Sequence, residues 1–282
     1  MKKVLITGVN SYVGNKFTEW MDNYPGEVDI DKVSMRDNKW RSMDFSVYDS
    51  ILHVAGIAHR KETQKNKGLY FKVNRDITYE IASKARKDGV NQFVFLSTMS
   101  IYGMITGEIG KKTIPNPSTF YGLSKLEAER DIFSLNNDKF KIAILRPPMI
   151  YGRNCPGNYT KLKRLVLKVP VFPAIENKRS MIYIENLSEF IKQIIFKEKS
   201  GFFMPQNNEY VSTFDLVKQI SIHNSHKIYF TSSFNKILIN LPINSIKKLF
   251  GNLVYSIDLS EENIKYNIYN FEESIELTEK DN

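Results

Sequence analysis

The chain has 282 residues, of which 42% are hydrophobic and 25% charged. This composition is that of a folded globular protein and excludes a disordered one. The single cysteine, Cys155, excludes an intramolecular disulfide, and four scattered histidines give no zinc-type spacing, so no metal is expected. No apolar run approaches the roughly 18 residues of a membrane span, and the short run after Lys3 is not a signal peptide, so we expect a cytoplasmic protein without a membrane segment.

The net charge of +9 is unevenly distributed along the chain. Residues 258–282 contain eight acidic residues and two lysines, which leaves +15 on residues 1–257. Because the basic residues are spread among Asn and Ile rather than clustered with aromatic residues, we do not expect a nucleic-acid partner. A basic body would instead attract a small anionic substrate.

The first 150 residues alternate between apolar strands and helical segments. Strands are predicted at 3–7, weakly at 32–35, and at 50–55, 92–97 and 141–146, and helices at 12–24, 69–88 and 118–135. This alternation predicts an α/β fold with a doubly wound parallel sheet that has helices on both faces.

After Pro148 the alternation of strands and helices gives way to shorter segments that contain several prolines. We therefore divide the chain into a dinucleotide-binding domain, 1–150, and a smaller mixed α/β substrate domain, 151–282, from which the chain is able to return to the sheet. Within the second part, residues 236–255 are apolar with interspersed lysines, a pattern that also suits a membrane surface. Pro242 and Gly251 interrupt that segment, so we expect ordinary packed helices there.

The segment TGVNSYVG, residues 7–14, lies between the first strand and the first helix. Free backbone N–H groups and the helix dipole at such a helix N-terminus favour a pyrophosphate, and glycines let the backbone approach it. This motif predicts a dinucleotide site.

Two further motifs carry hydroxyl and amino groups. Tyr121 and Lys125 are four residues apart in a predicted helix and share one face, so the lysine ammonium is expected to lower the pKa of the tyrosine phenol. Thr98 follows directly on a buried strand, at the sheet edge where α/β proteins bind ligands.

Together these motifs resemble the extended short-chain dehydrogenase/reductase family, the NAD-dependent nucleotide-sugar epimerases and dehydratases with a Rossmann fold. The resemblance is closest to bacterial UDP-sugar 4-epimerases and 4-keto reductases, and residues 53–59 (HVAGIAH) and 145–152 (LRPPMIYG) agree with it. It implies a catalytic triad of Thr98, Tyr121 and Lys125, a structural role for Asn74, and NAD or NADP as cofactor. Ser11 stands where the family usually has its middle glycine.

The same resemblance implies two sets of ligand-binding residues. The cofactor set is Thr7, Gly8, Ser11, Tyr12, Val13, Gly14, Arg36, Asp37, Asp44, Val54, Ala55, Gly56 and Lys125; the substrate set is Thr98, Met99, Ser100, Tyr121, Arg179 and His59. Only 15 residues separate Met35 from Ile51, so the adenosine-side elements are expected to be abbreviated. Arg36 and Asp37 leave NADP and NAD equally open, since a basic residue suits the NADP phosphate and an acidic one the NAD ribose.

The family resemblance also narrows the reaction. Dehydratases of this family resemble one another in an acidic pair where this chain has Met99 and Ser100, so a dehydratase is not expected. We expect a reductase of a nucleotide-linked 4-keto-6-deoxy sugar of the UDP-N-acetylhexosamine type, for bacterial surface polysaccharides. The alternatives are a UDP-sugar 4-epimerase with tightly bound NAD and a noncatalytic NAD(P)-binding regulator. A homodimer is left open.

Overall fold

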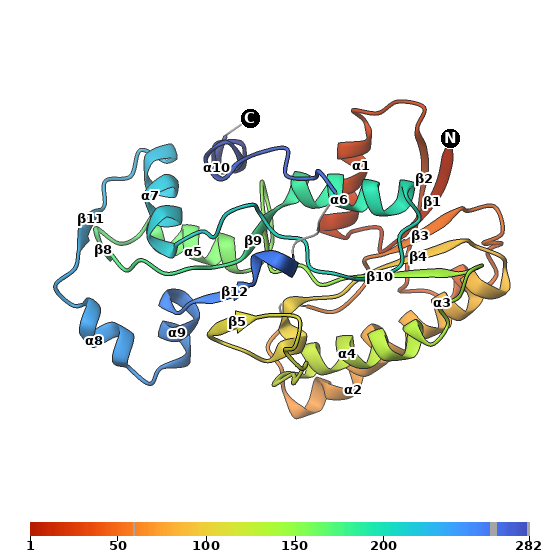
Figure 1. Ribbon diagram of the computed structural model, residues 1–282, viewed down its shortest axis with the longest axis horizontal. Helices are drawn as coiled ribbons and strands as arrows, with labels where there is room; N and C mark the ends of the chain where they lie inside the picture. Colours follow the sequence, from red (N-terminus) through yellow and green to blue (C-terminus); the bar gives the residue numbers. More distant parts are fainter. Residues whose placement is uncertain (59, 260–263, 281–282) are drawn as a thin grey trace.

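The computed structural model describes residues 1–58, 60–259 and 264–280 (Figure 1). Its centre is a six-stranded parallel sheet in the order β10-β6-β4-β3-β1-β2. The strands are β1 (Lys2–Thr7), β2 (Val28–Val33), β3 (Ser50–His53), β4 (Gln92–Leu96), β6 (Lys141–Leu145) and β10 (Gly201–Phe203). The predicted doubly wound α/β fold is confirmed.

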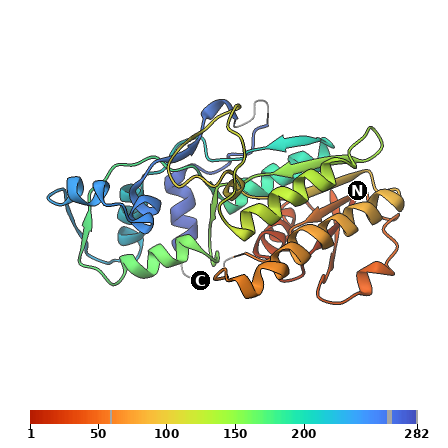
Figure 2. The same cartoon turned by 90° about the horizontal axis from the view of Figure 1, so that it is seen from below.

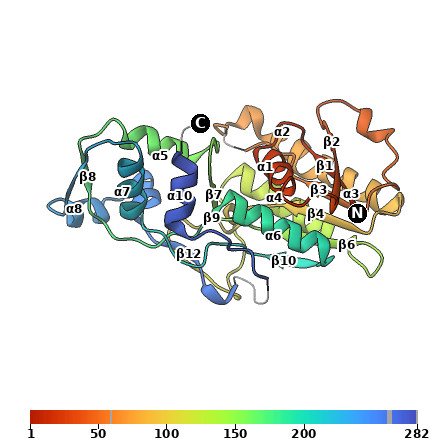
Figure 3. The same ribbon diagram turned by 90° about the horizontal axis from the view of Figure 1, so that it is seen from above.

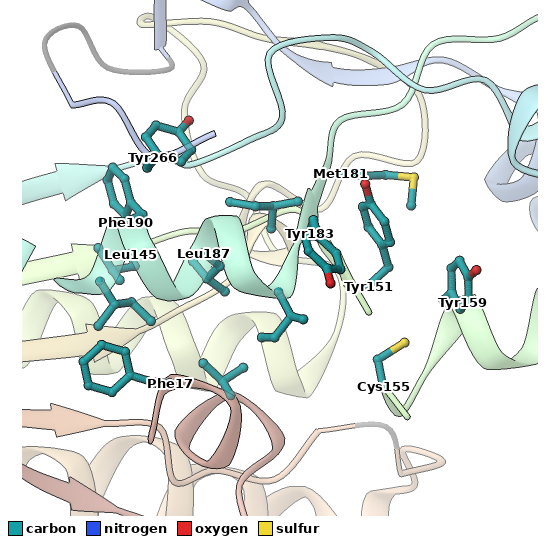
Figure 4. Packing of buried hydrophobic residues seen from close by; sticks show 14 of the residues in the cluster. Phe17, Leu145, Tyr151, Cys155, Tyr159, Met181, Tyr183, Leu187, Phe190 and Tyr266 are labelled. Carbon is teal, nitrogen blue, oxygen red and sulfur yellow. The ribbon is translucent and has the colours of Figure 1, made fainter. Parts of the chain in front are cut away.

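Alternate side chains of the strands enter two separate cores, one on each face of the sheet. Val4 and Ile6 lie in one core with α1 (Tyr12–Met21) and α6 (Ile184–Phe196). Leu5 lies in the other. That second core also contains residues of α3 (Ile77–Lys87) and α4 (Phe120–Phe133). Figure 4 shows Phe17 of α1 beside Leu187 and Phe190 of α6. Burial on both faces explains the continuous apolar runs of the central strands.

The second strand lies earlier than the sequence indicates. It spans Val28–Val33 rather than 32–35. The prediction was wrong because this strand lies at the edge of the sheet and contains the polar residues Asp29, Asp31 and Lys32, so its sequence is not a continuous apolar run. Between β2 and β3 the structure has only the 3-10 turn Lys39–Arg41. Numbered within the sheet, the strand order is therefore 2-1-3-4-5-6. Compared with the Rossmann order 3-2-1-4-5-6, the sheet lacks the strand beyond β2 and has one further strand, β10, at the opposite edge. The expected abbreviation on the adenosine side is confirmed.

The helix predicted at 69–88 is continuous but not uniform. It consists of α2 (Lys67–Phe71), a π-helical turn (Lys72–Asp76) and α3 (Ile77–Lys87). Asn74 lies in the π turn and is buried. Its side-chain Oδ1 accepts the Ile57 N–H at 2.7 Å, and its Nδ2 donates to the Ile57 carbonyl and to the Ser124 hydroxyl, each at 3.1 Å. Asn74 thus joins the loop after β3 to α4, which is a structural role.

The remaining elements gather beside the sheet, with α5, α7 and α8 at the far end of the molecule (Figures 1–3). Three pairs of short parallel strands are β5 (Gly107–Ile109) with β12 (Leu253–Tyr255), β7 (Met149–Tyr151) with β9 (Met181–Tyr183), and β8 (Val171–Pro173) with β11 (Tyr229–Thr231). The helices are α5 (Asn158–Val166), α7 (Thr213–His223), α8 (Asn235–Asn240), α9 (Asn244–Phe250) and α10 (Phe271–Glu279). None of the helices in the described ranges is long and apolar enough to cross a membrane.

Residues 236–255 do not pack uniformly. Phe250 and β12 are buried, as expected of packed segments. The structure contradicts that expectation for α8, where no residue is buried. The reason is that α8 and its flanking turns lie at the outer end of the molecule rather than between other helices (Figure 1).

Candidate functional site

The predicted site residues converge on the carboxyl edge of the sheet, where β1, β3 and β4 end. The strand order reverses direction between β1 and β3, and such a switch point opens a crevice for ligands in α/β sheets. Gly8 follows β1, residues 54–56 follow β3, and Thr98 follows β4.

The first turn of the site depends on two glycines. Gly8 has a φ of +96°, and a Cβ on it would lie 3.2 Å from Ala55 Cα. A Cβ on Gly14 would lie 2.9 Å from Ile6 Cγ2, so only glycine lets α1 pack this closely on β1. These contacts bring the N-terminus of α1 to the edge of the sheet.

Ser11 is the N-cap of α1. Its backbone is extended (φ −70°, ψ 129°) and its Oγ accepts the Gly14 N–H at 3.3 Å. Within the described part of the chain, the N–H groups of Tyr12 and Val13 have no acceptor, as is usual in a first helical turn. These two donors and the helix dipole fit a pyrophosphate, so the turn suits a dinucleotide.

Several predicted cofactor residues use their side chains elsewhere. The Thr7 hydroxyl is buried and lies 2.7 Å from Nδ1 of His53, whose pKa burial lowers to about 3. Tyr12 donates its hydroxyl to the Arg153 carbonyl at 3.0 Å. Val13 and Val54 belong to the core. Only the backbones of these four residues are therefore available to a cofactor.

The adenosine-side candidates are exposed on the short β2–β3 connection. Arg36 lies three residues beyond the end of β2. Asp37 Oδ1 accepts the Lys39 N–H at 3.1 Å, and Asp44 Oδ1 accepts the Ser46 N–H at 2.9 Å. Hydrogen bonds from Ser46 hold the pKa of the Asp44 carboxyl below its usual value. Both carboxylates are exposed and already accept local backbone N–H groups.

Tyr121 and Thr98 are brought together by the first turn of α4. Thr119 caps this helix by accepting the Gly122 N–H at 3.0 Å. A Cβ on Gly122 would lie 2.7 Å from the Ser100 carbonyl oxygen, so glycine lets α4 lie directly against the turn that follows β4. The Thr98 hydroxyl consequently lies beside the Tyr121 phenol, where it acts to lower the pKa of the phenol.

The pKa of Tyr121 departs from the sequence-based expectation. Burial raises the pKa of the phenol above its ordinary value of 10, and the Thr98 contact opposes that change. The expected lowering by Lys125 is not seen in this structure, because desolvation dominates and the ammonium is not among the groups that act on the phenol. Thr98 Oγ1 also lies 3.2 Å from Ser100 Oγ. Since the threonine hydroxyl has a single proton, it donates either to Ser100 or to Tyr121.

Lys125 is buried one turn after Tyr121. Its Nζ donates to the Leu96 carbonyl at 2.9 Å and lies 4.4 Å from the centre of the Phe95 ring. Burial lowers the pKa of its ammonium to about 7, and the carboxylate of Glu129 acts in the opposite direction. A Cβ on Gly56 would lie 3.4 Å from this Nζ, so the glycine after β3 leaves room for the lysine.

Glu62 is a site residue that sequence reasoning missed. Its two carboxylate oxygens accept the backbone N–H groups of Phe120 at 2.8 Å and Tyr121 at 2.9 Å. A carboxylate is stabilised at a helix N-terminus by the free donors and the dipole. The contact joins positions 58 and 59 residues apart, so no local pattern could have found it.

Glu129 and Arg146 form a second missed feature, a buried ion pair below the site. Arg146 donates to both oxygens of Glu129, at 2.6 Å for Nη2 to Oε2, and to the Tyr102 hydroxyl at 2.9 Å. Ser97, at the end of β4, donates to the same carboxylate. Glu129 follows Lys125 by four residues on the same helix face, which is the signal that could have indicated it.

The predicted substrate residues are only partly assembled. Met99 and exposed Ser100 adjoin Thr98 and carry no acid. Arg179 is bonded through its Nη1 to the Gly251 carbonyl at 3.2 Å, burial lowers its pKa, and no acidic partner is found in the described ranges. His59 lies outside the described residues. Among the residues that the structure describes, no cluster could hold a metal ion.

Comparisons with known proteins agree with this geometry. A UDP-glucose 4-epimerase of Vibrio cholerae is 29% identical over 248 residues, 78% of this chain and 75% of the relative. The N-acetyl-alpha-D-glucosaminyl-diphospho-ditrans,octacis-undecaprenol 4-epimerase of Escherichia coli O157:H7 is 27% identical over 71% of this chain, and this chain covers 65% of that relative. A dTDP-4-dehydrorhamnose reductase structure from Clostridium acetobutylicum has a TM-score of 0.73 at 18% identity, covering 97% of each chain.

The model of one family, described as the NAD dependent epimerase/dehydratase family, matches residues 4–202. This match spans the glycine turn, Thr98, Tyr121, Lys125 and Arg179. The chain therefore belongs to the NAD dependent epimerase/dehydratase family, which confirms the predicted fold and an enzyme that depends on NAD or NADP.

Proposed function

We propose that this protein catalyses reversible hydride transfer at C4 of a sugar carried on a diphosphate. The observation that carries the proposal is the contact between Thr98 and Tyr121, with Lys125 one helical turn away, at the sheet edge beside the glycine turn. A phenol, a hydroxyl and a buried amine in this arrangement suit proton exchange with a secondary alcohol.

The chain's own residues divide the chemistry between them. The α1 N-terminus would hold the pyrophosphate of the cofactor, and Lys125 the ribose next to the nicotinamide. The cofactor supplies a hydride acceptor and donor when bound. Tyr121 moves the proton on the C4 oxygen, and Thr98 orients that oxygen and stabilises the phenolate with its O–H.

Arg179 supports a substrate that carries a diphosphate. Its guanidinium is desolvated, and among the residues that the structure describes its one side-chain hydrogen bond goes to the Gly251 carbonyl, so an anion would complete its hydrogen bonds. The named substrates of the two curated relatives share a sugar diphosphate, on a nucleoside in one and on undecaprenol in the other. We propose the sugar diphosphate as the recognised unit, with a nucleotide sugar as the first carrier to test. Nucleotide sugars and nicotinamide cofactors are cytoplasmic metabolites, and the cytoplasm remains the proposed location.

Epimerase and reductase remain two outcomes of the same chemistry. We place the 4-epimerase first, because the two curated relatives described above are named as 4-epimerases, whereas the solved reductase shares 18% identity and hence the fold alone. The reductase of a 4-keto-6-deoxy sugar is the second candidate, supported by the abbreviated adenosine side, which offers fewer contacts to retain a cofactor. A noncatalytic regulator is disfavoured, since it would not need Tyr121 and Lys125.

Denaturing the purified protein and quantifying the released nucleotide distinguishes the two outcomes. A 4-epimerase regenerates its cofactor and should release close to one NAD per chain. A reductase should release little, and should oxidise added NADH or NADPH in proportion to a supplied UDP-linked 4-keto sugar. If the protein released no nucleotide and turned over no substrate, with or without added cofactor, both candidate functions would be contradicted.

A further inference from the structure

The end of the molecule that lies farthest from the sheet contains β8, β11 and α8 (Figures 1 and 3). Large apolar side chains of this end are exposed. We name this surface the apolar tip. It consists of Val171, Tyr229, Phe234, Ile237, Ile239 and Ile243, which are between 46% and 62% exposed. Scattered apolar residues are ordinary on a protein surface, but a continuous group of this kind marks an interaction site.

The members of the apolar tip are neighbours in the structure. Val171 of β8 stands opposite Tyr229 of β11 in the strand pair. The turn between β11 and α8 is held to β8, since Asn235 Nδ2 donates to the Ala174 carbonyl at 2.6 Å. Because α8 buries none of its residues, Ile237 and Ile239 remain 62% and 54% exposed.

Positive side chains predominate in the segments that form the apolar tip, and the exposed acids next to these segments in the chain are Glu176 and Asp215. Residues 216–257 contain five lysines and no acidic residue, and residues 139–175, which include α5 and β8, also lack acids. In residues 158–175 and 216–257 the exposed lysines are Lys161, Lys168, Lys218, Lys227, Lys236, Lys247 and Lys248, and none of them forms an ion pair within the described ranges. The segments that form the apolar tip therefore carry an excess of positive charge.

We propose that the apolar tip docks on the surface of an anionic lipid bilayer. Exposed aliphatic side chains that flank lysines insert into the boundary between headgroups and acyl chains, while the lysines are attracted by anionic headgroups. A second copy of the chain is disfavoured because two equally basic tips repel each other. A nucleic acid is disfavoured because four of the six residues of the apolar tip are aliphatic and offer no stacking surface to bases.

Vesicle binding tests this proposal independently of the proposed function, since it is measured without substrate. The full chain is sedimented with vesicles of phosphatidylglycerol and phosphatidylcholine, and with vesicles of phosphatidylcholine alone. We expect binding to the anionic vesicles that weakens steeply as salt increases, and at least tenfold weaker binding to the neutral ones.

Two sets of variants assign the binding to the apolar tip. Ile237→Asp/Ile239→Asp should weaken binding to anionic vesicles more than tenfold, and Lys236→Gln/Lys247→Gln/Lys248→Gln should weaken it and flatten the salt dependence. Val47→Asp, a matched change of a 52% exposed residue in the β2–β3 connection, should bind as the parent does. All these positions are exposed, and circular dichroism should confirm that each variant is folded.

Three results would overturn the proposal. The first is no binding of the parent to anionic vesicles. The second is equal binding by the aspartate pair and the Val47 control. The third is a dimer in analytical ultracentrifugation that Ile237→Asp/Ile239→Asp dissociates, which would assign the apolar tip to a second copy of this chain.

Discussion

The carboxylate of Glu62 accepts the backbone N–H of Tyr121 at 2.9 Å, and so connects the loop after β3 to the first turn of α4. Its other oxygen accepts the Phe120 N–H at 2.8 Å. The same loop is held at Ile57 by the buried Asn74. The position of Tyr121 therefore depends on a loop that precedes it in the chain by nearly 60 residues.

Glu62→Ala should loosen the first turn of α4. We expect a loss of about 1 kcal/mol in the free energy of unfolding, the usual value of a helix N-terminal contact, and a lower kcat with nearly unchanged cofactor affinity. Urea denaturation and steady-state kinetics check this. The conservative Glu62→Gln should recover part of the loss, and Glu272→Ala, on the exposed start of α10, serves as the control. Unchanged stability and kcat in Glu62→Ala would show that the contact does not position Tyr121.

Thr98→Val should move the pH dependence of kcat to higher pH. The Thr98 hydroxyl lowers the pKa of the Tyr121 phenol, so its removal leaves burial unopposed and raises that pKa further. In the direction that oxidises the alcohol, Tyr121 must accept a proton, and a higher pKa shifts the rising limb upward. Loss of this donor should also lower kcat by about 10²-fold. Thr98→Ser should restore both, and an unshifted limb in Thr98→Val would contradict the role of the hydroxyl.

Ser11→Ala should destabilise the protein by about 1 kcal/mol, because it removes the hydroxyl that accepts the Gly14 N–H at the start of α1. Ser11→Gly should lower the free energy of unfolding by only about a few tenths of a kcal/mol, since glycine is tolerated at an N-cap. Thermal unfolding of both variants checks the order. If Ser11→Gly proved the less stable of the two, the capping role of Ser11 would be wrong.

Lys125 should make stability depend on pH. Burial lowers its pKa to about 7 in the folded protein, below the value of about 10.4 in an unfolded chain. Between these values the unfolded chain binds a proton that the folded protein lacks, so the free energy of unfolding rises with pH in this window. The slope for the parent should exceed that of Lys125→Met by up to about 1.4 kcal/mol per pH unit. Lys112→Met, at an exposed position, should keep the parental slope; identical slopes in all three proteins would refute the depressed pKa.

The sheet and the positions of Thr98, Tyr121 and Lys125 at its edge could be predicted because their signals are local. Apolar runs such as those of β1 and β4 are buried on both faces, and the spacing of Tyr121 and Lys125 is fixed by helix geometry. The position of the edge strand β2 was predicted wrongly, because half-exposed edge strands tolerate Asp and Lys and so lack a clear apolar pattern. The role of Glu62 could not be predicted, because its partner Tyr121 lies 59 residues farther along the chain.

The direction of the Tyr121 pKa could not be inferred from spacing either. Four residues of separation place the lysine on the correct face, but the lysine turns to the Leu96 carbonyl, and the burial that decides the pKa comes from packing against other segments. Likewise, the apolar run at 236–255 gives no indication of which part is covered, because that depends on where α8 lies in the molecule.

The central claim is that Tyr121 exchanges a proton at C4 while hydride moves to and from that carbon. Proton NMR of UDP-glucose and UDP-N-acetylglucosamine, incubated separately with the purified protein and no added cofactor, tests it most directly. We predict that the signals of the C4 epimer grow to equilibrium with the parent, and that Tyr121→Phe lowers the rate by roughly 10² to 10⁴ while still binding NAD. Epimerisation by Tyr121→Phe at the parental rate would contradict the account.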